Sequence, residues 1–130
     1  MQTHYRVLVV DDSDHVRILV SKRLKQREFQ EIDTALDGKI ALEKVKSFRP
    51  DIIFLDAVMP EVGGLEVLQS VKKEAPGIIV VMMSSISARE EILKFKEAGA
   101  DAYILKPFEN QKFDDVLDKV LVLLSSRKEG

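Results

Sequence analysis

Short apolar runs alternate with longer amphipathic stretches along most of the chain. The runs predict strands at residues 7–10, 52–55, 78–83 and 103–105, with a weaker one at 31–36. Their brevity and β-branched content favour strand over buried helix, and continuous apolar runs are typical of parallel strands buried on both faces. Amphipathic spacing predicts a first helix that carries Val16, Leu19, Val20 and Leu24 on one face, and further helices over 38–48, 64–74, 87–98 and 109–125.

Capping and stop signals set the boundaries of these helices. Asp12 or Ser13 can cap the first helix, Pro76 and Gly77 end the third, and Gly99 ends the fourth. The last helix has the clearest apolar stripe, made of Phe113, Val116, Leu117, Val120, Leu121 and Leu124. Strands and helices therefore alternate as βα units, which predicts an α/β fold with a parallel sheet covered by helices on both faces.

Composition limits the chemistry that the chain can perform. It has 130 residues, of which 45% are apolar and 32% charged, as in one globular domain. The absence of cysteine excludes disulfides, thiolate metal sites and a cysteine nucleophile, and two histidines are too few for a histidine-rich metal site. A net charge of −2 gives no general attraction to nucleic acid or anionic lipid. No apolar run is long enough for a signal peptide or a membrane span, so we expect a cytoplasmic protein.

Polar side chains follow the predicted strands at the edge where a doubly wound sheet binds ligands. Asp11 and Asp12 follow the first strand, Asp56 the third, Ser84 the fourth and Lys106 the fifth. Each has a simpler interpretation, as a helix cap, a turn residue or a solvated lysine. Together they favour a site, because the first and third strands should be adjacent. Two carboxylates about 4 Å apart there would repel by about 4 kcal/mol at an effective dielectric constant of about 20.

Such crowding either raises carboxyl pKa values or recruits a cation. Oxygen ligands favour a hard ion, above all Mg²⁺, with Mn²⁺ or Ca²⁺ as alternatives. Mg²⁺ prefers few carboxylates, several waters and a phosphoryl oxygen, and Lys106 and Ser84 are suitable partners for a phosphoryl group. Asp56 is then a candidate carboxylate nucleophile, since aspartyl phosphates are a known covalent strategy.

Four motifs, in this order, resemble the receiver domain of two-component response regulators over residues 5 to about 124. The motifs are Val9-Val10-Asp11-Asp12-Ser13, Phe54-Leu55-Asp56-Ala57-Val58-Met59-Pro60 with Gly64, Ser84, and Tyr103-Ile104-Leu105-Lys106-Pro107-Phe108. The resemblance implies one receiver domain over residues 1–130, with a flavodoxin-like parallel sheet of strand order 2-1-3-4-5 and five helices. Within this family, the first motif and the Ser84-Ser85 pair resemble those of chemotaxis regulators.

The resemblance also implies roles for the strand-end residues. Asp11, Asp12, Asp56 and the Val58 carbonyl are expected to hold Mg²⁺, with Mn²⁺ as an alternative. Asp56 is expected to accept a phosphoryl group from a histidine kinase or phosphotransfer protein, and Lys106 to pair with that group. Like other receivers, the chain would promote its own phosphorylation and dephosphorylation without turning over an external substrate.

A switch is implied at the fourth and fifth strands. Ser84 is expected to sense the phosphoryl group, a role for which Ser85 could compete, and Tyr103 to turn inward in response. A plain amphipathic residue at the sheet edge remains the alternative for Tyr103. The switch would alter the surface formed by the fourth helix, fifth strand and fifth helix, where an output protein docks. We expect a monomer or weak homodimer with no direct nucleic-acid or membrane partner. The peptide between Lys106 and Pro107 is expected to be cis.

Three other functions fit the sequence less well. A haloacid-dehalogenase-like phosphatase needs a second acid two residues after its nucleophile, where this chain has Val58. A flavodoxin binds phosphate through a hydroxyl-rich and glycine-rich loop, whereas Asp11, Asp12 and Asp14 would repel phosphate. A receiver that acts only as a docking module is disfavoured because every expected phosphorylation residue is present.

Overall fold

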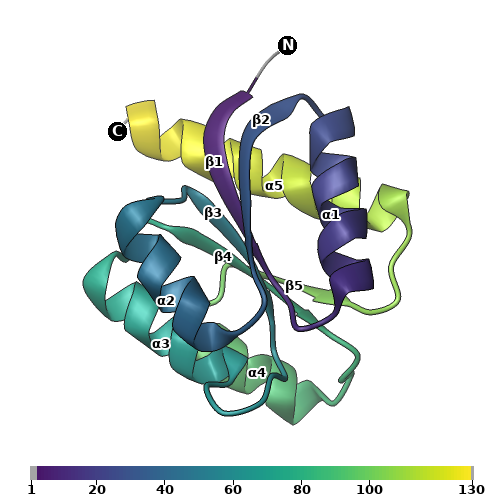
Figure 1. Ribbon diagram of the computed structural model, residues 1–130, viewed down its shortest axis with the longest axis vertical. Coiled ribbons are helices and arrows are strands. Elements are labelled where there is room, and N and C mark those ends of the chain that lie inside the picture. The colour runs from purple at the N-terminus through teal and green to yellow at the C-terminus, as the bar shows by residue number, and fades with distance from the viewer. Residues whose placement is uncertain (1–2, 130) are drawn as a thin grey trace.

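The computed structural model describes residues 3–129, which form a parallel sheet covered by helices on both faces (Figure 1). The five strands are β1 (Thr3–Val10), β2 (Phe29–Ala35), β3 (Ile52–Asp56), β4 (Ile79–Ser84) and β5 (Ala102–Leu105). The helices are α1 (Asp14–Gln26), α2 (Gly38–Ser47), α3 (Gly64–Glu74), α4 (Arg89–Glu97) and α5 (Asn110–Glu129). The strand order β2-β1-β3-β4-β5 confirms the predicted doubly wound, flavodoxin-like sheet.

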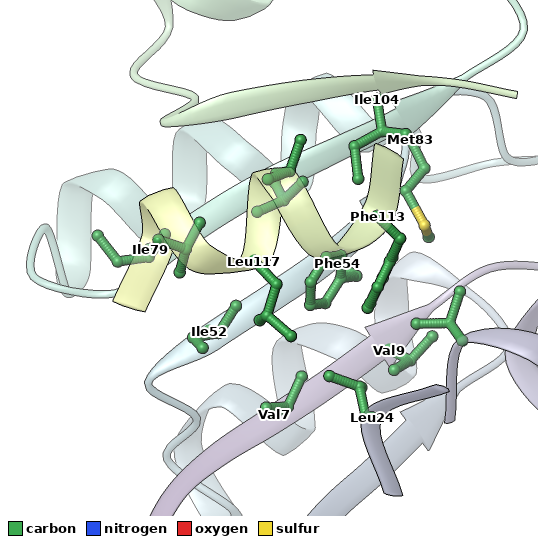
Figure 2. Packing of buried hydrophobic residues seen from close by; sticks show 14 of the residues in the cluster. Val7, Val9, Leu24, Ile52, Phe54, Ile79, Met83, Ile104, Phe113 and Leu117 are labelled. Atoms are coloured by element: carbon green, nitrogen blue, oxygen red, sulfur yellow. The ribbon is translucent and has the colours of Figure 1, made fainter. Parts of the chain in front are cut away.

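Helices α1 and α5 cover one face of the sheet, and α2, α3 and α4 cover the other (Figure 1). Alternate residues of each central strand supply the two cores: Val7 and Val9 point to the α1/α5 face, and Leu8 and Val10 to the opposite face. Figure 2 shows the α1/α5 core, in which Phe54 and Phe113 stack with ring centroids 5.0 Å apart. Burial on both faces explains why residues 7–10 of β1, 52–55 of β3 and 79–83 of β4 are continuous apolar runs.

The observed boundaries differ from the predicted ones at most elements, and β1 begins at Thr3 rather than residue 7. Strand β2 begins at Phe29 rather than residue 31, because Phe29 is buried in the α1/α5 core and pairs with Thr3. Helix α4 begins at Arg89 rather than residue 87, since the backbone of Ala88 is extended (φ −62°, ψ 124°). Helix α5 continues past residue 125 to Glu129, and Arg127 donates a hydrogen bond to the carbonyl of Gly77 at 2.8 Å.

Two local predictions at the carboxyl edge of the sheet are confirmed, the cap of α1 and the cis peptide after β5. Ser13 is the N-cap of α1, where its hydroxyl accepts a hydrogen bond from the backbone N–H of Val16 at 3.3 Å. The Lys106–Pro107 peptide is cis, as expected. Across residues 3–129, no helix is long and apolar enough to cross a membrane.

Candidate functional site

The predicted strand-end residues meet at the carboxyl edge of the sheet. Asp11 and Asp56 follow or end the adjacent strands β1 and β3, and Ser84 ends β4 beside Leu105 of β5. Asp11, Asp56 and Ser84 are buried, with exposed fractions of 0%, 5% and 2%. Three polar side chains buried at one sheet edge require partners, because an unpaired buried polar group costs several kcal/mol.

Lys106 supplies the positive charge at this edge. Its Nζ donates a hydrogen bond to Asp11 Oδ2 at 2.7 Å and lies 3.4 Å from Asp56 Oδ1. The lysine side chain is itself only 21% exposed. One ammonium therefore faces two carboxylates in a poorly solvated place, which leaves the group with a net negative charge.

Backbone contacts fix the direction of the Asp56 carboxylate. Its Oδ1 accepts a hydrogen bond from the N–H of Val58 at 3.2 Å, and the next peptide is tied to β4 by the Ala57 N–H to Met83 carbonyl bond of 2.9 Å. Helix α3 starts directly against this turn, because a Cβ at Gly64 would lie 2.3 Å from the Asp56 carbonyl oxygen. The close approach is open only to glycine, so Gly64 holds the backbone that carries Asp56.

Ile86 links Ser84 to Tyr103. The Ile86 N–H donates to Ser84 Oγ at 3.0 Å, and the Ile86 carbonyl accepts from the Tyr103 hydroxyl at 3.1 Å. Tyr103 is half-buried, and its ring also meets Phe95 of α4 at a centroid distance of 6.0 Å. The hydroxyl of Ser84 is thus connected through one residue to the side chain at the β5 edge.

Burial raises the pKa of Asp56 to about 6, and the charge of Asp11 acts in the same direction against the opposing pull of Lys106. The pKa of Lys106 is raised as well: burial lowers it, but the hydrogen bond to Asp11 and the charge of Asp56 outweigh burial. Without a bound cation, the negative charge of Asp56 is therefore unfavourable in the folded protein at neutral pH.

This shift predicts that Asp56→Asn stabilises the cation-free protein. Because the pKa rises from 3.8 unfolded to about 6 folded, the folded state binds more protons between these values, and stability falls as pH rises through that window. At neutral pH the variant should gain about 1–2 kcal/mol, less than the roughly 3 kcal/mol of an unscreened shift of this size. Urea unfolding with a chelator present should show this gain, and should show none below pH 3.8. Equal stabilities of wild type and Asp56→Asn at neutral pH would contradict the raised pKa of the Asp56 carboxyl.

The acidic residues fit a divalent cation. Oxygen atoms of Asp11, Asp12 and Asp56 all lie within 4.8 Å of one another, and Asp12 is exposed while the other two are buried. The donor set is entirely carboxylate oxygen, which suits Mg²⁺ or Mn²⁺ and not a soft metal. A cation would also offset the excess negative charge that Lys106 leaves.

The structure brings Asp11, Asp12, Asp56 and Lys106 together, and places Ser84 at the end of the neighbouring strand β4. The simpler interpretations hold in part: Ser13 does cap α1, and Asp56 does bond to the turn that follows it, but Ser84 is not a helix cap. Two contributors were missed. Gly64 was noted only as part of a motif, and Arg17, whose guanidinium donates to the Asp11 carbonyl at 2.7 Å, left no signal in the apolar pattern.

A doubly wound sheet with this acidic edge and opposing lysine is typical of a receiver domain. The sequence model of the family described as "Response regulator receiver domain" matches residues 7–118. The chain belongs to this family.

Among known proteins, the chain is similar to single-domain chemotaxis regulators. It is 38% identical over 116 residues to the chemotaxis protein CheY of Halobacterium salinarum, covering 89% of this chain and 96% of that protein. Chemotaxis response regulator CheY4 of Vibrio cholerae superposes with a TM-score of 0.84 at 32% identity, covering 91% and 99% of the two chains. The response regulator domain of Thermotoga maritima CheB gives a TM-score of 0.81 at 31% identity, covering 93% and 96%.

Membership has general consequences for chemistry and partners. Receiver domains bind Mg²⁺ at an acidic pocket, and the cluster of Asp11, Asp12 and Asp56 is consistent with one. They work with histidine kinases and downstream output proteins, and single domains such as CheY are regulators rather than enzymes. The chain is thus a CheY-like receiver of two-component signalling.

Proposed function

We propose that Asp56 accepts a phosphoryl group from a histidine kinase or phosphotransfer protein, in a reaction that depends on Mg²⁺. The observation that carries this proposal is the buried Asp56 carboxylate, 3.4 Å from Lys106 Nζ and within 4.8 Å of the Asp11 and Asp12 oxygens. A carboxylate oxygen attacks phosphorus in line as the bond from phosphorus to the donor nitrogen breaks. The electron pair of that bond stays on the imidazole nitrogen of the donor, which takes up a proton from water. One receiver domain, residues 1–130, performs this reaction.

The neighbours of Asp56 have distinct roles in this reaction. Lys106 offsets charge on the transferring phosphoryl oxygens, which is how phosphoryl transfer is mostly accelerated. Asp11, Asp12, Asp56 and the Val58 carbonyl would hold Mg²⁺, with Mn²⁺ as a substitute. When bound, that cation supplies further positive charge to the same oxygens and to the acidic cluster itself.

The phosphorylated state is read out through Ser84. A phosphoryl group adds roughly −1.5 to −2 charges and strong acceptors, so the Ser84 hydroxyl gains a better partner. Because Ile86 bonds to both Ser84 and Tyr103, a shift of Ser84 changes the support of Tyr103. Phosphorylation then shifts the population between two packings of the protein. This shift alters the surface formed by α4, β5 and α5, on which a cytoplasmic output protein docks.

Intact mass tests the proposed function directly. Incubation with acetyl phosphate and Mg²⁺ should add the mass of one phosphoryl group to the wild-type chain. Asp56→Asn should add none, a chelator should prevent the addition, and the matched variant Asp115→Asn, at an exposed position on α5, should behave as wild type. Equal phosphorylation of Asp56→Asn, or none in any sample, would overturn the proposal.

The phosphorylated state should be long-lived, because apolar side chains flank Asp56. Val58 is 61% exposed and Ile86 half-buried, at positions where many receivers carry polar groups that orient the attacking water. Val58→Asn should speed hydrolysis about tenfold by supplying such a group, whereas Val122→Asn on α5 should have no effect. Decay of the phosphorylated mass after donor removal measures this. An unaided wild-type lifetime of seconds is incompatible with the prediction.

A further inference from the structure

The loop that carries Asp11 and Asp12 is tied to the first turns of α1 by Arg17. Guanidinium NH1 donates to the Asp11 carbonyl at 2.7 Å, and NH2 bonds to the Asp14 carboxylate. Although charged, the Arg17 side chain is only 16% exposed, whereas that of Asp14 is 86% exposed. The arginine therefore lies along the loop rather than in solvent.

The bonded carbonyl belongs to the peptide that joins the two carboxylates of the acidic cluster. The other polar atoms of Asp11 are already held: its N–H donates to Ala35, Oδ1 accepts from the Ser13 N–H, and Oδ2 accepts from Lys106. The bond from Arg17 fixes the remaining one, the carbonyl, and with it the plane of the Asp11–Asp12 peptide. Asp11 is fully buried, so without Arg17 this acceptor would have to find another donor.

The plane of that peptide sets where the Asp12 side chain points. Asp12 is exposed, and among residues 3–129 no other residue donates a hydrogen bond to its carboxylate. Its position relative to Asp11 and Asp56 therefore depends on its backbone. The guanidinium presents its donors in a fixed fork, so NH1 and NH2 of Arg17 reach the Asp11 carbonyl and the Asp14 carboxylate together.

We infer that Arg17 is a positioning residue for the cation site, which sets the affinity for Mg²⁺ by holding the Asp11–Asp12 peptide. This rests on the proposed function, since it assumes that the acidic cluster binds the cation. Simple electrostatics gives the opposite sign: removing a positive charge close to a cation site should tighten binding. The pairing of Arg17 with Asp14 reduces the repulsion that its charge would otherwise cause.

Mg²⁺ affinity, read from the rise of the thermal unfolding midpoint with Mg²⁺ concentration, tests this inference without phosphorylation. Arg17→Ala should weaken Mg²⁺ binding about tenfold, the lower end of the effect of losing a group that orients metal ligands. The rate of phosphorylation by acetyl phosphate at saturating Mg²⁺ should stay within about twofold of wild type, because a saturating concentration fills even the weakened site. The Mg²⁺ affinity of Arg17→Lys should lie between those of wild type and Arg17→Ala. Lys22→Ala, at an exposed position on the same helix, should not weaken Mg²⁺ binding.

Unchanged or tighter Mg²⁺ binding in Arg17→Ala would overturn the inference, as would a lowered rate at saturating Mg²⁺ with unchanged affinity. If Arg17→Ala does not fold, Arg17→Lys decides: it keeps the charge, so wild-type affinity in it rejects the need for the fork. Wild-type protein that fails to bind Mg²⁺ at all would instead count against the proposed function.

Discussion

Replacing Lys106 by methionine is expected to slow the phosphorylation of Asp56 by about a hundredfold to a thousandfold, as for loss of one charge-stabilising donor. Lys106 is the one cationic side chain that the structure places against Asp56 among residues 3–129, with Nζ 3.4 Å from the carboxylate. Methionine has a similar length and shape, so the change removes the charge with little loss of packing. Phosphorylation by acetyl phosphate at saturating Mg²⁺, followed by intact mass, measures the effect.

The same variant should lose stability when no divalent cation is present. Asp11 and Asp56 would then be buried without a counter-ion, which should cost about 2–3 kcal/mol at neutral pH, less than a fully uncompensated pair because Asp56 takes up a proton. Mg²⁺ should recover most of this loss. Lys119→Met, at an exposed site on α5, should change neither the rate nor the stability. A rate within about threefold of wild type would remove Lys106 from the reaction, since a charge-stabilising donor contributes far more than that.

Gly64→Ala is expected to destabilise the protein by about 3 kcal/mol or more, at or above the upper end of overpacking effects. The added Cβ would lie 2.3 Å from the Asp56 carbonyl oxygen and 2.7 Å from Ala57 Cα, so backbone rather than a flexible side chain must move. That backbone carries Asp56, so the folded fraction should also be phosphorylated more slowly. Urea unfolding and acetyl phosphate labelling measure the two effects.

The adjacent glycine is a matched control. A Cβ at Gly63 would have no atom within 4 Å, and the residue has an extended backbone (φ −77°, ψ 169°) that alanine also adopts. Gly63→Ala should therefore leave stability within about 0.5 kcal/mol of wild type, as expected of a surface substitution. Similar losses in both variants would show that the close approach of α3 to β3 is not what Gly64 permits.

Much of the fold follows from the sequence because the central strands are buried on both faces. Their runs of apolar residues, separated by amphipathic helices, left one plausible architecture, and the five strands and five helices were all anticipated. Strand order came from the family resemblance rather than from periodicity. The errors lie at ends such as Phe29 and Ala88, where tertiary pairing and backbone conformation decide and local pattern carries little information.

The membership of the site was predictable, but its internal connections were not. Position after a strand was enough to bring Asp11, Asp56, Ser84 and Lys106 to one edge. Lys106 Nζ bonds to Asp11 Oδ2 at 2.7 Å. This pairing depends on the geometry of side chains across the sheet, which the spacing of residues along the chain does not encode. The link from Ser84 through Ile86 is similar, because it uses backbone groups that every residue possesses.

The central claim is that Asp56, and no other residue, carries the phosphoryl group. Borohydride reduces an acyl phosphate to an alcohol, so trapping the phosphorylated chain and mapping its peptides reports the position directly. The account predicts homoserine at position 56 alone, and only when Mg²⁺ was present. Homoserine at position 11 or 12, or a phosphorylated chain that borohydride leaves unchanged because the group sits on Ser84 or His15, would contradict it.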